Sequence, residues 1–211
     1  MGHYGISGNR SLVDLAMILA ELKAATAEIH ARTERLLPSL AALATRAGYV
    51  RCLVLLHEFH AGWEPAIWST AGVKESGFDR RTRAKLPLIA HDLECLDVVH
   101  GDRLSAVPQP ILADCATALG ALYVLEGATL GGQVIERHAA RDVGITPDEG
   151  GSYFHGYGAR TGDMWRAFGD TLSAWVDRNG QAPSIVQGSV DCFLALESWA
   201  GQSALEAVAH D

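Results

Sequence analysis

The chain has 211 residues, somewhat more than the ~150 residues of an average domain, so one domain is favoured over two. Hydrophobic residues make up 48% and charged residues 20%, as in ordinary globular proteins, which excludes a disordered chain or a low-complexity repeat. The 17 basic and 25 acidic residues leave a net charge of −8, which argues against nucleic acid or an anionic membrane surface as partner.

The sequence also indicates the compartment. The longest uncharged stretch near its middle, Cys115 to Leu125, is far shorter than the ~20 apolar residues that a membrane-spanning helix needs. The first residues lack the charged start and apolar run of a secretory signal. We therefore expect a cytoplasmic protein that spans no membrane. The four cysteines lie far apart without a CxxC pair, and we expect them to be reduced and mostly buried: Cys52, Cys95, Cys115 and Cys192.

The first helical pattern is a series of apolar residues from Leu12 to Leu36, spaced by three, four or seven. Ser11 and Asp14 have the spacing of a capping box at its start, and Pro38 is expected to end it. Residues 1–10, which precede this helix, are expected to be flexible.

Three further segments follow before the middle of the chain. A short helix is predicted from about Ser39 to Gly48. A longer one is predicted from Tyr49 towards Trp68, with Pro65 as a kink or end. Asp79 then caps a charged segment that becomes apolar over residues 86–96.

The second half predicts one long helix, one loop and two final helices. After a break at Pro108 and Pro110, residues 111 to about 141 predict a helix interrupted by glycines. Residues 142–162 contain six glycines and one proline and predict a loop within the domain. Helices are predicted over 161–179 and 184–208. With no strand alternation and no internal repeat, we expect a single all-α domain over residues 1–211, an irregular bundle of seven or eight helices.

One candidate for chemistry lies on the first helix. Thr26, His30 and Glu34 follow each other at one-turn spacing. A histidine that binds a metal usually gives its other ring N–H to a carboxylate, and Glu34 is placed to accept it. Without further evidence, this pattern more often comes from an exposed or core histidine with an ordinary helical neighbour than from a metal ligand.

The second candidate is the set of glycines inside the long helix: Gly127, Gly131 and Gly132. Each costs roughly 1 kcal/mol relative to alanine. Two explanations remain open. Gly127 and Gly131 have the GxxxG spacing of close helix–helix contacts. Alternatively, a bent helix brings bare backbone against a flat ligand.

Both stretches resemble those of a known family. The proximal-helix motif of heme oxygenases resembles residues 22–34, LKAATAEIHARTE. Their distal-helix motif resembles residues 121–135, ALYVLEGATLGGQVI, above all in the bacterial members that accompany bacteriophytochromes. The resemblance covers roughly residues 11–180 and implies the all-α heme oxygenase fold.

The resemblance implies a role for particular residues. His30 becomes the axial iron ligand and Glu34 its partner, while the distal glycines let their helix lie over the heme face. The candidate catalytic residues are His30, Gly127, Ala128 and Gly131. Those that the resemblance places around the heme also include Lys23 and Arg166 as cations for the propionates, together with Thr26, Tyr123 and Gly132. The loop aromatics Tyr153, Phe154 and Tyr157 either cover a heme edge or pack on the core, and Tyr157 is our candidate for the heme edge.

One residue departs from the family pattern. Many heme oxygenases have an aspartate directly after the first distal glycine, where it organises water near dioxygen, and this chain has Ala128. Its hydrogen-bonding network must therefore differ. Thr129, Gln133 or backbone carbonyls at the glycines are the candidates to hold that water.

The implied function is the cleavage of heme to biliverdin, ferrous iron and carbon monoxide, with heme as both substrate and cofactor and dioxygen as co-substrate. Electrons would come from an external donor such as ferredoxin or a flavin reductase, and a bacteriophytochrome is a candidate acceptor of the biliverdin. The alternatives are a non-catalytic heme carrier on the same fold, motivated by Ala128, and a relative that acts on another small molecule. His57 and His60 are expected to be packing or surface groups, because the chain lacks the Glu-x-x-His motif of di-iron bundles.

Overall fold

The computed structural model describes residues 12–98 and 107–210, and in that part of the chain it contains helices and no strand. The predicted all-α fold is confirmed. The long helices are α1 (Leu12–Leu36), α3 (Arg46–Ser69), α6 (Cys115–Val143), α8 (Thr161–Asn179) and α9 (Ala182–His210). The shorter ones are α2 (Leu40–Leu43), α4 (Arg80–Arg83), α5 (Leu86–Cys95), α7 (Ser152–His155) and the 3-10 helix η1 (Gly158–Arg160). The expectations for residues 1–10 and for Ser11 lie outside the described residues.

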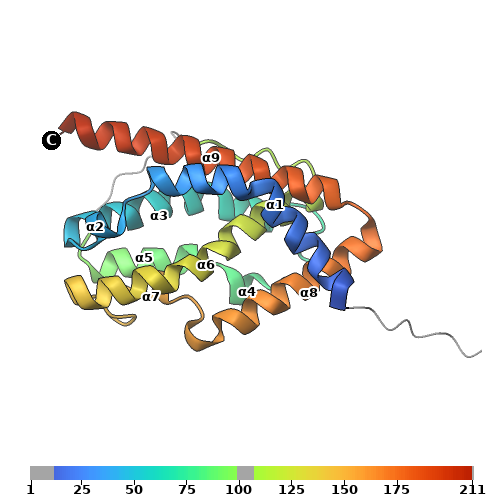
Figure 1. The fold of residues 1–211 in the computed structure, drawn as a ribbon, viewed down its shortest axis with the longest axis horizontal. Coiled ribbons are helices and arrows are strands. Elements are labelled where there is room, and N and C mark those ends of the chain that lie inside the picture. Colours follow the sequence, from blue (N-terminus) through green and yellow to red (C-terminus); the bar gives the residue numbers. More distant parts are fainter. Residues whose placement is uncertain (1–11, 99–106, 211) are drawn as a thin grey trace, which may run out of the picture.

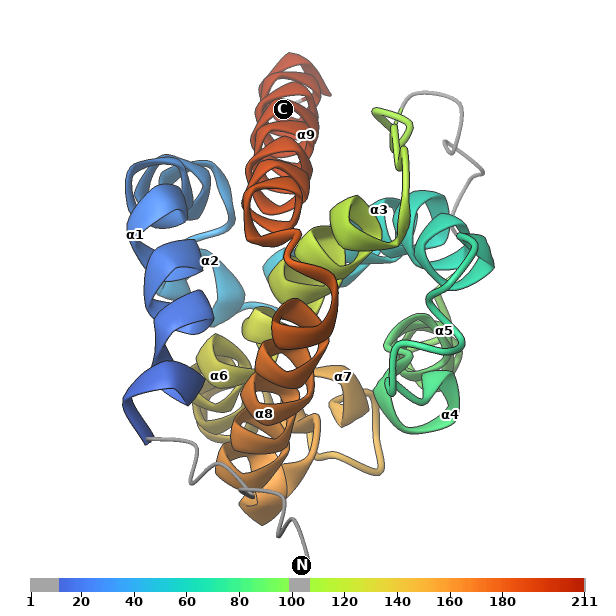
Figure 2. The ribbon, with the colours of Figure 1, turned by 90° about the vertical axis from the view of Figure 1, so that its right-hand side faces the viewer.

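Helix α6 is the centre of the bundle (Figure 1). It packs mainly on α9 and also contacts α2, α3, α7 and α8, while α1 packs on α9 and α8. Figure 2 shows α1 on one side of α6 and α8, and α4 and α5 on the other. The main core lies between α1, α3, α6, α8 and α9, and a second cluster joins α2, α3, α5 and α7 to the end of α6.

The crossing of α6 and α9 is the closest contact between two long helices. A Cβ atom at Gly120 would lie 2.0 Å from the carbonyl oxygen of Ile185. A Cβ atom at Gly188 would lie 2.2 Å from the carbonyl oxygen of Thr117. No side chain fits at either position, so the two backbones meet directly. The sequence analysis did not single out either glycine.

The start and course of α6 differ from the prediction. The helix begins at Cys115, four residues later than expected, because Asp114 and Thr117 form a capping box. The Asp114 carboxylate accepts from the Thr117 N–H at 2.9 Å, and the Asp114 N–H donates to the Thr117 hydroxyl at 3.1 Å. The predicted interruption at the glycines was wrong, since α6 is one continuous helix. The packing of the buried side of α6 against neighbouring helices outweighs the low helix propensity of its glycines.

Other boundaries moved by a few residues. Pro65 lies inside α3, which continues to Ser69, and α3 begins at Arg46 because the Thr45 hydroxyl accepts from the Gly48 N–H. The short helix predicted before it therefore ends at Leu43. The glycine-rich segment contains α7 and η1, so it is only partly a loop. Helix α8 has the predicted bounds, and α9 is longer than predicted by two residues at each end.

By length and composition alone α6 would suffice to cross a membrane, but 56% of its most apolar window is buried inside the fold. The core helix of a folded domain gives the same signal, so α6 is no evidence of a membrane span. The cysteines are free thiols, of which Cys52 and Cys192 are buried, Cys115 is half-buried and Cys95 is exposed.

We expect Gly120→Ala to lower the free energy of unfolding by about 3 kcal/mol, because its methyl group would force α6 and α9 apart. Gly162→Ala is the matched control, since a Cβ atom there meets nothing within 4 Å. Denaturant unfolding measures both variants. Equal stability of the two would contradict direct backbone contact at this crossing.

Candidate functional site

Helices α1 and α6 meet where the side chains of Thr26 and Tyr123 touch. Burial raises the pKa of Tyr123, and its hydrogen bond with the Thr26 hydroxyl opposes that rise. Both helices run in the same direction, from right to left in Figure 1. His30 and Gly127, each four residues further along its helix, therefore lie on the same side of this contact. The two motifs that the sequence singled out thus follow this contact on the same side of it.

The imidazole of His30 is oriented but not enclosed. Its side chain is 53% exposed, and its Nδ1 lies 3.7 Å from Oε1 of Glu34. This is an ion-pair distance, slightly too long for a hydrogen bond. On α9, the ring of Phe193 meets the imidazole edge to face, with centroids 5.4 Å apart. Among the described residues none hydrogen-bonds to Nε2, so this nitrogen is open to a ligand.

The glycine stretch of α6 presents bare backbone. A Cβ atom at Gly131 would meet nothing within 4 Å, and one at Gly127 would meet only ring carbons of Trp165 at 3.8 and 3.9 Å. Ala128 is exposed, and on the same stretch Leu130 and Val134 are 44% and 39% exposed. Contact between helices therefore does not account for Gly127 and Gly131.

Gly132 has a different environment from the other two glycines. A Cβ atom there would lie 2.9 Å from the carbonyl oxygen of Phe154, so this glycine lets α7 approach α6. Tyr153 and Phe154 are buried in the second core cluster. These two aromatics pack on the core, as one of the two interpretations of the loop predicted.

The two predicted propionate cations lie on neighbouring helices. A Cβ atom at Gly169 on α8 would lie 2.6 Å from Cδ1 of Leu19 on α1, so the two helices nearly touch there. Figure 1 shows that they run in opposite directions. Lys23 follows Leu19 by one turn and Arg166 precedes Gly169 by about one turn, so both lie on the same side of that contact. Both side chains are exposed, and Arg166 pairs with Asp163.

A buried cluster of charges lies behind the glycine stretch, and the sequence analysis missed it. The Glu126 carboxylate is hydrogen-bonded to the guanidinium of Arg83, and its Oε2 lies 3.5 Å from Nζ of Lys85. The Tyr157 hydroxyl lies 2.9 and 3.0 Å from its two oxygens and 2.6 Å from Nζ of Lys85. Tyr157 is thus half-buried in this cluster, and its contact with heme stays a prediction.

Burial and charge shift the pKa values in this cluster. Burial lowers the pKa of the Lys85 ammonium, and the nearby Glu126 carboxylate opposes that change. Burial, followed by the negative charge of Glu126, raises the pKa of Tyr157 well above its usual value. One signal for this site was present in the sequence, since Glu126 is the first charged residue after the uncharged stretch from Cys115.

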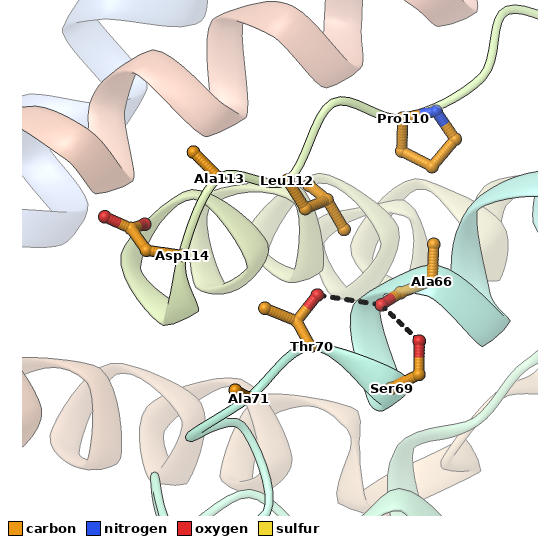
Figure 3. A pocket seen from close by; sticks show the side chains of 8 residues that line it. All are labelled: Ala66, Ser69, Thr70, Ala71, Pro110, Leu112, Ala113 and Asp114. Carbon is orange, nitrogen blue, oxygen red and sulfur yellow. Dashed lines mark hydrogen bonds between the residues drawn. The ribbon is translucent and has the colours of Figure 1, made fainter.

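One surface hollow, near the start of α6, is not this site. Figure 3 shows a pocket of about 390 Å³ between the end of α3 and the segment that leads into α6. The hydroxyls of Ser69 and Thr70 both donate to the carbonyl oxygen of Ala66, and Asp114 caps α6. No predicted site residue lines this hollow. Within the described residues, no three histidine, cysteine or acidic side chains gather into a metal site.

Comparison with known proteins indicates which family the chain resembles. The model of the heme oxygenase family matches residues 100–201, a range that includes the glycine stretch of α6. This part of the chain, just under half of its length, is thus similar to the heme oxygenase family. The match does not extend to residues 22–34, so the role of His30 rests on the resemblance and on the geometry above.

Solved heme oxygenases share the fold. The heme oxygenase of Neisseria meningitidis, solved in NO- and CO-bound forms, has 22% sequence identity and a TM-score of 0.76, over 89% of this chain and 92% of that one. Heme oxygenase 2 from Chlamydomonas reinhardtii, solved without heme, has 15% identity and a TM-score of 0.67, over 87% and 95% of the two chains. No curated protein sequence matches.

A second buried carboxylate, that of Glu64 on α3, lies beside this cluster. Glu64 accepts from the backbone N–H groups of Lys85 and Leu86, and its Oε1 lies 3.3 Å from Nδ1 of His60. Burial acts to raise the pKa of Glu64, but these hydrogen bonds outweigh it and hold the pKa below the ordinary 4.5. The stability that this carboxylate contributes is present above the unfolded-state pKa and is lost as pH falls through the lower folded-state value.

We expect Glu64→Gln to reduce the stability at pH 7 by about 1–3 kcal/mol, because one backbone N–H loses its acceptor. We also expect a flatter dependence of stability on pH below about 4.5. Thermal unfolding between pH 3 and pH 7 measures both effects. An unchanged acid slope in the variant would show that Glu64 is not responsible.

Proposed function

We propose that this protein is a heme oxygenase that binds heme between His30 and the glycine stretch of α6. It would cleave heme to biliverdin, ferrous iron and carbon monoxide, using dioxygen and external electrons. The observation that carries the proposal is the uncovered backbone at Gly127 and Gly131. It lies on the same side of the Thr26–Tyr123 contact as His30, and among the described residues a Cβ atom at Gly131 would meet nothing within 4 Å.

The side chains around this place suit heme. A flat macrocycle needs one iron ligand, apolar walls and cations for two propionates. His30 offers an open Nε2, and the exposed Leu130 and Val134 offer apolar surface. Lys23 and Arg166 offer two cations on the adjoining helices. A ligand with this combination of charge and shape would cover the apolar groups that α6 leaves exposed.

When bound, heme supplies the iron that takes up dioxygen and the macrocycle that is oxidised. His30 would hold the iron through Nε2, with the Glu34 carboxylate 3.7 Å from Nδ1 as the group beside its other ring nitrogen. The backbone at Gly127 and Gly131 would lie against the heme and limit the space there, so that only a small molecule would fit beside it.

Ala128 leaves the organisation of water to other groups. Its methyl group forms no hydrogen bond, and two of the three candidates to replace an aspartate are engaged elsewhere. The Thr129 hydroxyl donates to the Glu126 carbonyl at 2.7 Å, and the Gln133 amide donates to the Gly158 carbonyl at 3.2 Å. We assign this role to the carbonyl oxygens of the glycine stretch, whose second lone pairs no side chain covers.

The reaction also needs groups that the protein does not provide. The chain has no group that stores electrons, so an external donor such as ferredoxin or a flavin reductase is part of the proposal. We place the protein in the cytoplasm, where a bacteriophytochrome would be an acceptor of its biliverdin.

Titration with hemin tests heme ligation. Purified protein should develop a Soret band that His30→Ala loses or shifts, because the iron no longer has its imidazole. Glu28→Gln is the control, since Glu28 is an exposed residue on the same helix. An identical Soret spectrum in His30→Ala would remove His30 from the site.

Replacement of Gly131 tests the close approach of backbone and heme. Because a Cβ atom there meets nothing within 4 Å, Gly131→Leu should leave the thermal stability of the apo protein within about 1 kcal/mol of the original. The same side chain should weaken hemin binding at least tenfold, or about 1.4 kcal/mol. Unchanged affinity would contradict our placement of the heme.

Turnover separates the enzyme from a carrier. The hemin complex, supplied with ferredoxin and its reductase or with ascorbate in air, should lose its Soret band as bilin absorption grows. Chromatography then identifies the bilin. A stable oxygenated spectrum without bilin would favour the heme carrier that Ala128 motivates.

A further inference from the structure

We propose that Glu126 is a positioning residue for the heme face of α6. Its buried carboxylate, held by Arg83, Lys85 and Tyr157, fixes the backbone of the adjoining stretch from Gly127 to Gly131. The consequence for heme rests on the proposed function, whereas the consequence for the backbone does not.

The first argument is the burial of the carboxylate. Glu126 is only 1% exposed, and an ionised carboxylate is costly to bury unless it is paired and hydrogen-bonded. Here both oxygens are satisfied. Arg83 binds Oε1, Lys85 lies 3.5 Å from Oε2, and the Tyr157 hydroxyl is within 3.0 Å of both oxygens. Loss of either cation would remove an ion pair and loss of the Tyr157 hydroxyl would remove a hydrogen bond, so each partner constrains the position of the carboxylate.

The second argument is the origin of the partners. Arg83 and Lys85 flank the junction of α4 and α5, and Tyr157 lies between α7 and η1. The Lys85 ammonium also lies 3.8 Å from the centre of the Tyr157 ring. Segments that are distant in sequence thus converge on a single side chain of α6.

The partners are themselves anchored. The backbone N–H of Lys85 is bound by Glu64 of α3. The guanidinium of Arg83 lies 5.5 and 5.4 Å from the rings of Phe78 and Phe168 and donates to the Met164 carbonyl of α8 at 3.4 Å. Through Lys85 and Arg83, the position of Glu126 therefore depends on α3 and α8, which are long helices of the main core.

The third argument is that the heme face of α6 cannot position itself. Gly127 and Gly131 have no side chains, and their outer side is uncovered. Contacts on the opposite side must hold this stretch. Beyond Glu126, these are the packing of Gly132 on Phe154 and the hydrogen bond from Gln133 to Gly158. Glu126 adds charged contacts to these and directly precedes the first glycine, whereas the next charged contact from α6 to α7 in the described part of the chain, between Glu136 and His155, lies beyond the glycines.

Hydrogen exchange of the apo protein tests the proposal without heme. Glu126→Gln keeps the shape but removes the charge, and amide exchange over residues 127–133 should become about tenfold faster, or ~1.4 kcal/mol. Exchange in α9 should change much less. Tyr157→Phe should give a smaller effect, and the double variant should give less than the sum of the two. Glu126→Asp, which keeps the charge, should partly restore protection.

The matched control is Leu43→Ala, which destabilises the second core cluster without contact to the Glu126 cluster. Hemin release should be about tenfold faster in Glu126→Gln, or ~1.4 kcal/mol, but not in Leu43→Ala. Exchange that rises equally over all helices in Glu126→Gln would overturn the positioning role. If the unaltered protein binds no hemin, the proposed function fails, while the exchange of residues 127–133 still decides this inference.

Discussion

The direct backbone contact between α6 and α9 is the constraint on which the rest of the structure depends. At Gly120 and Gly188 the two helices meet without side chains between them. This contact fixes the first half of α6 in the main core, together with α1, which packs on the same α9. In the following part of α6, Gly127 and Gly131 present backbone that neighbouring side chains leave largely uncovered. One helix therefore uses glycine for two opposite purposes, close packing and an open face.

The charged cluster around Glu126 lies where these two halves join. A protein of this size has little stability to spare, so Gly127, Gly131 and Gly132, three of the four glycines in its central helix, require compensation. This compensation comes from the side of α6 away from the proposed heme. Apolar residues before Gly127 are buried there, and the carboxylate of Glu126 has its hydrogen bonds satisfied. The arrangement explains why α6 remains one continuous helix although its sequence predicts an interruption.

Predictions that depend on local chemistry were largely correct. The bounds of α8 and the all-α class depend on residues within a turn or two of each other. His30 and Glu34 lie 3.7 Å apart, and the role of Glu34 as partner of an iron-binding histidine stays a prediction. The start of α6 was misplaced because the capping box at Asp114 was overlooked, although both of its residues are visible in the sequence. The roles of Gly120 and Gly188 were not predictable, because each depends on a carbonyl group of a helix distant in the chain.

The sequence by itself determined that the chain forms a helical bundle and that a histidine motif and a glycine motif are its candidates for chemistry, because period and spacing are local properties. Only the tertiary structure decided which glycines are covered and which are open. It also decided that Arg83 and Lys85, in a segment that the sequence shows only as charged, turn inward to Glu126. Burial and charge pairing depend on which helices pack together, and that choice minimises the free energy of the whole chain.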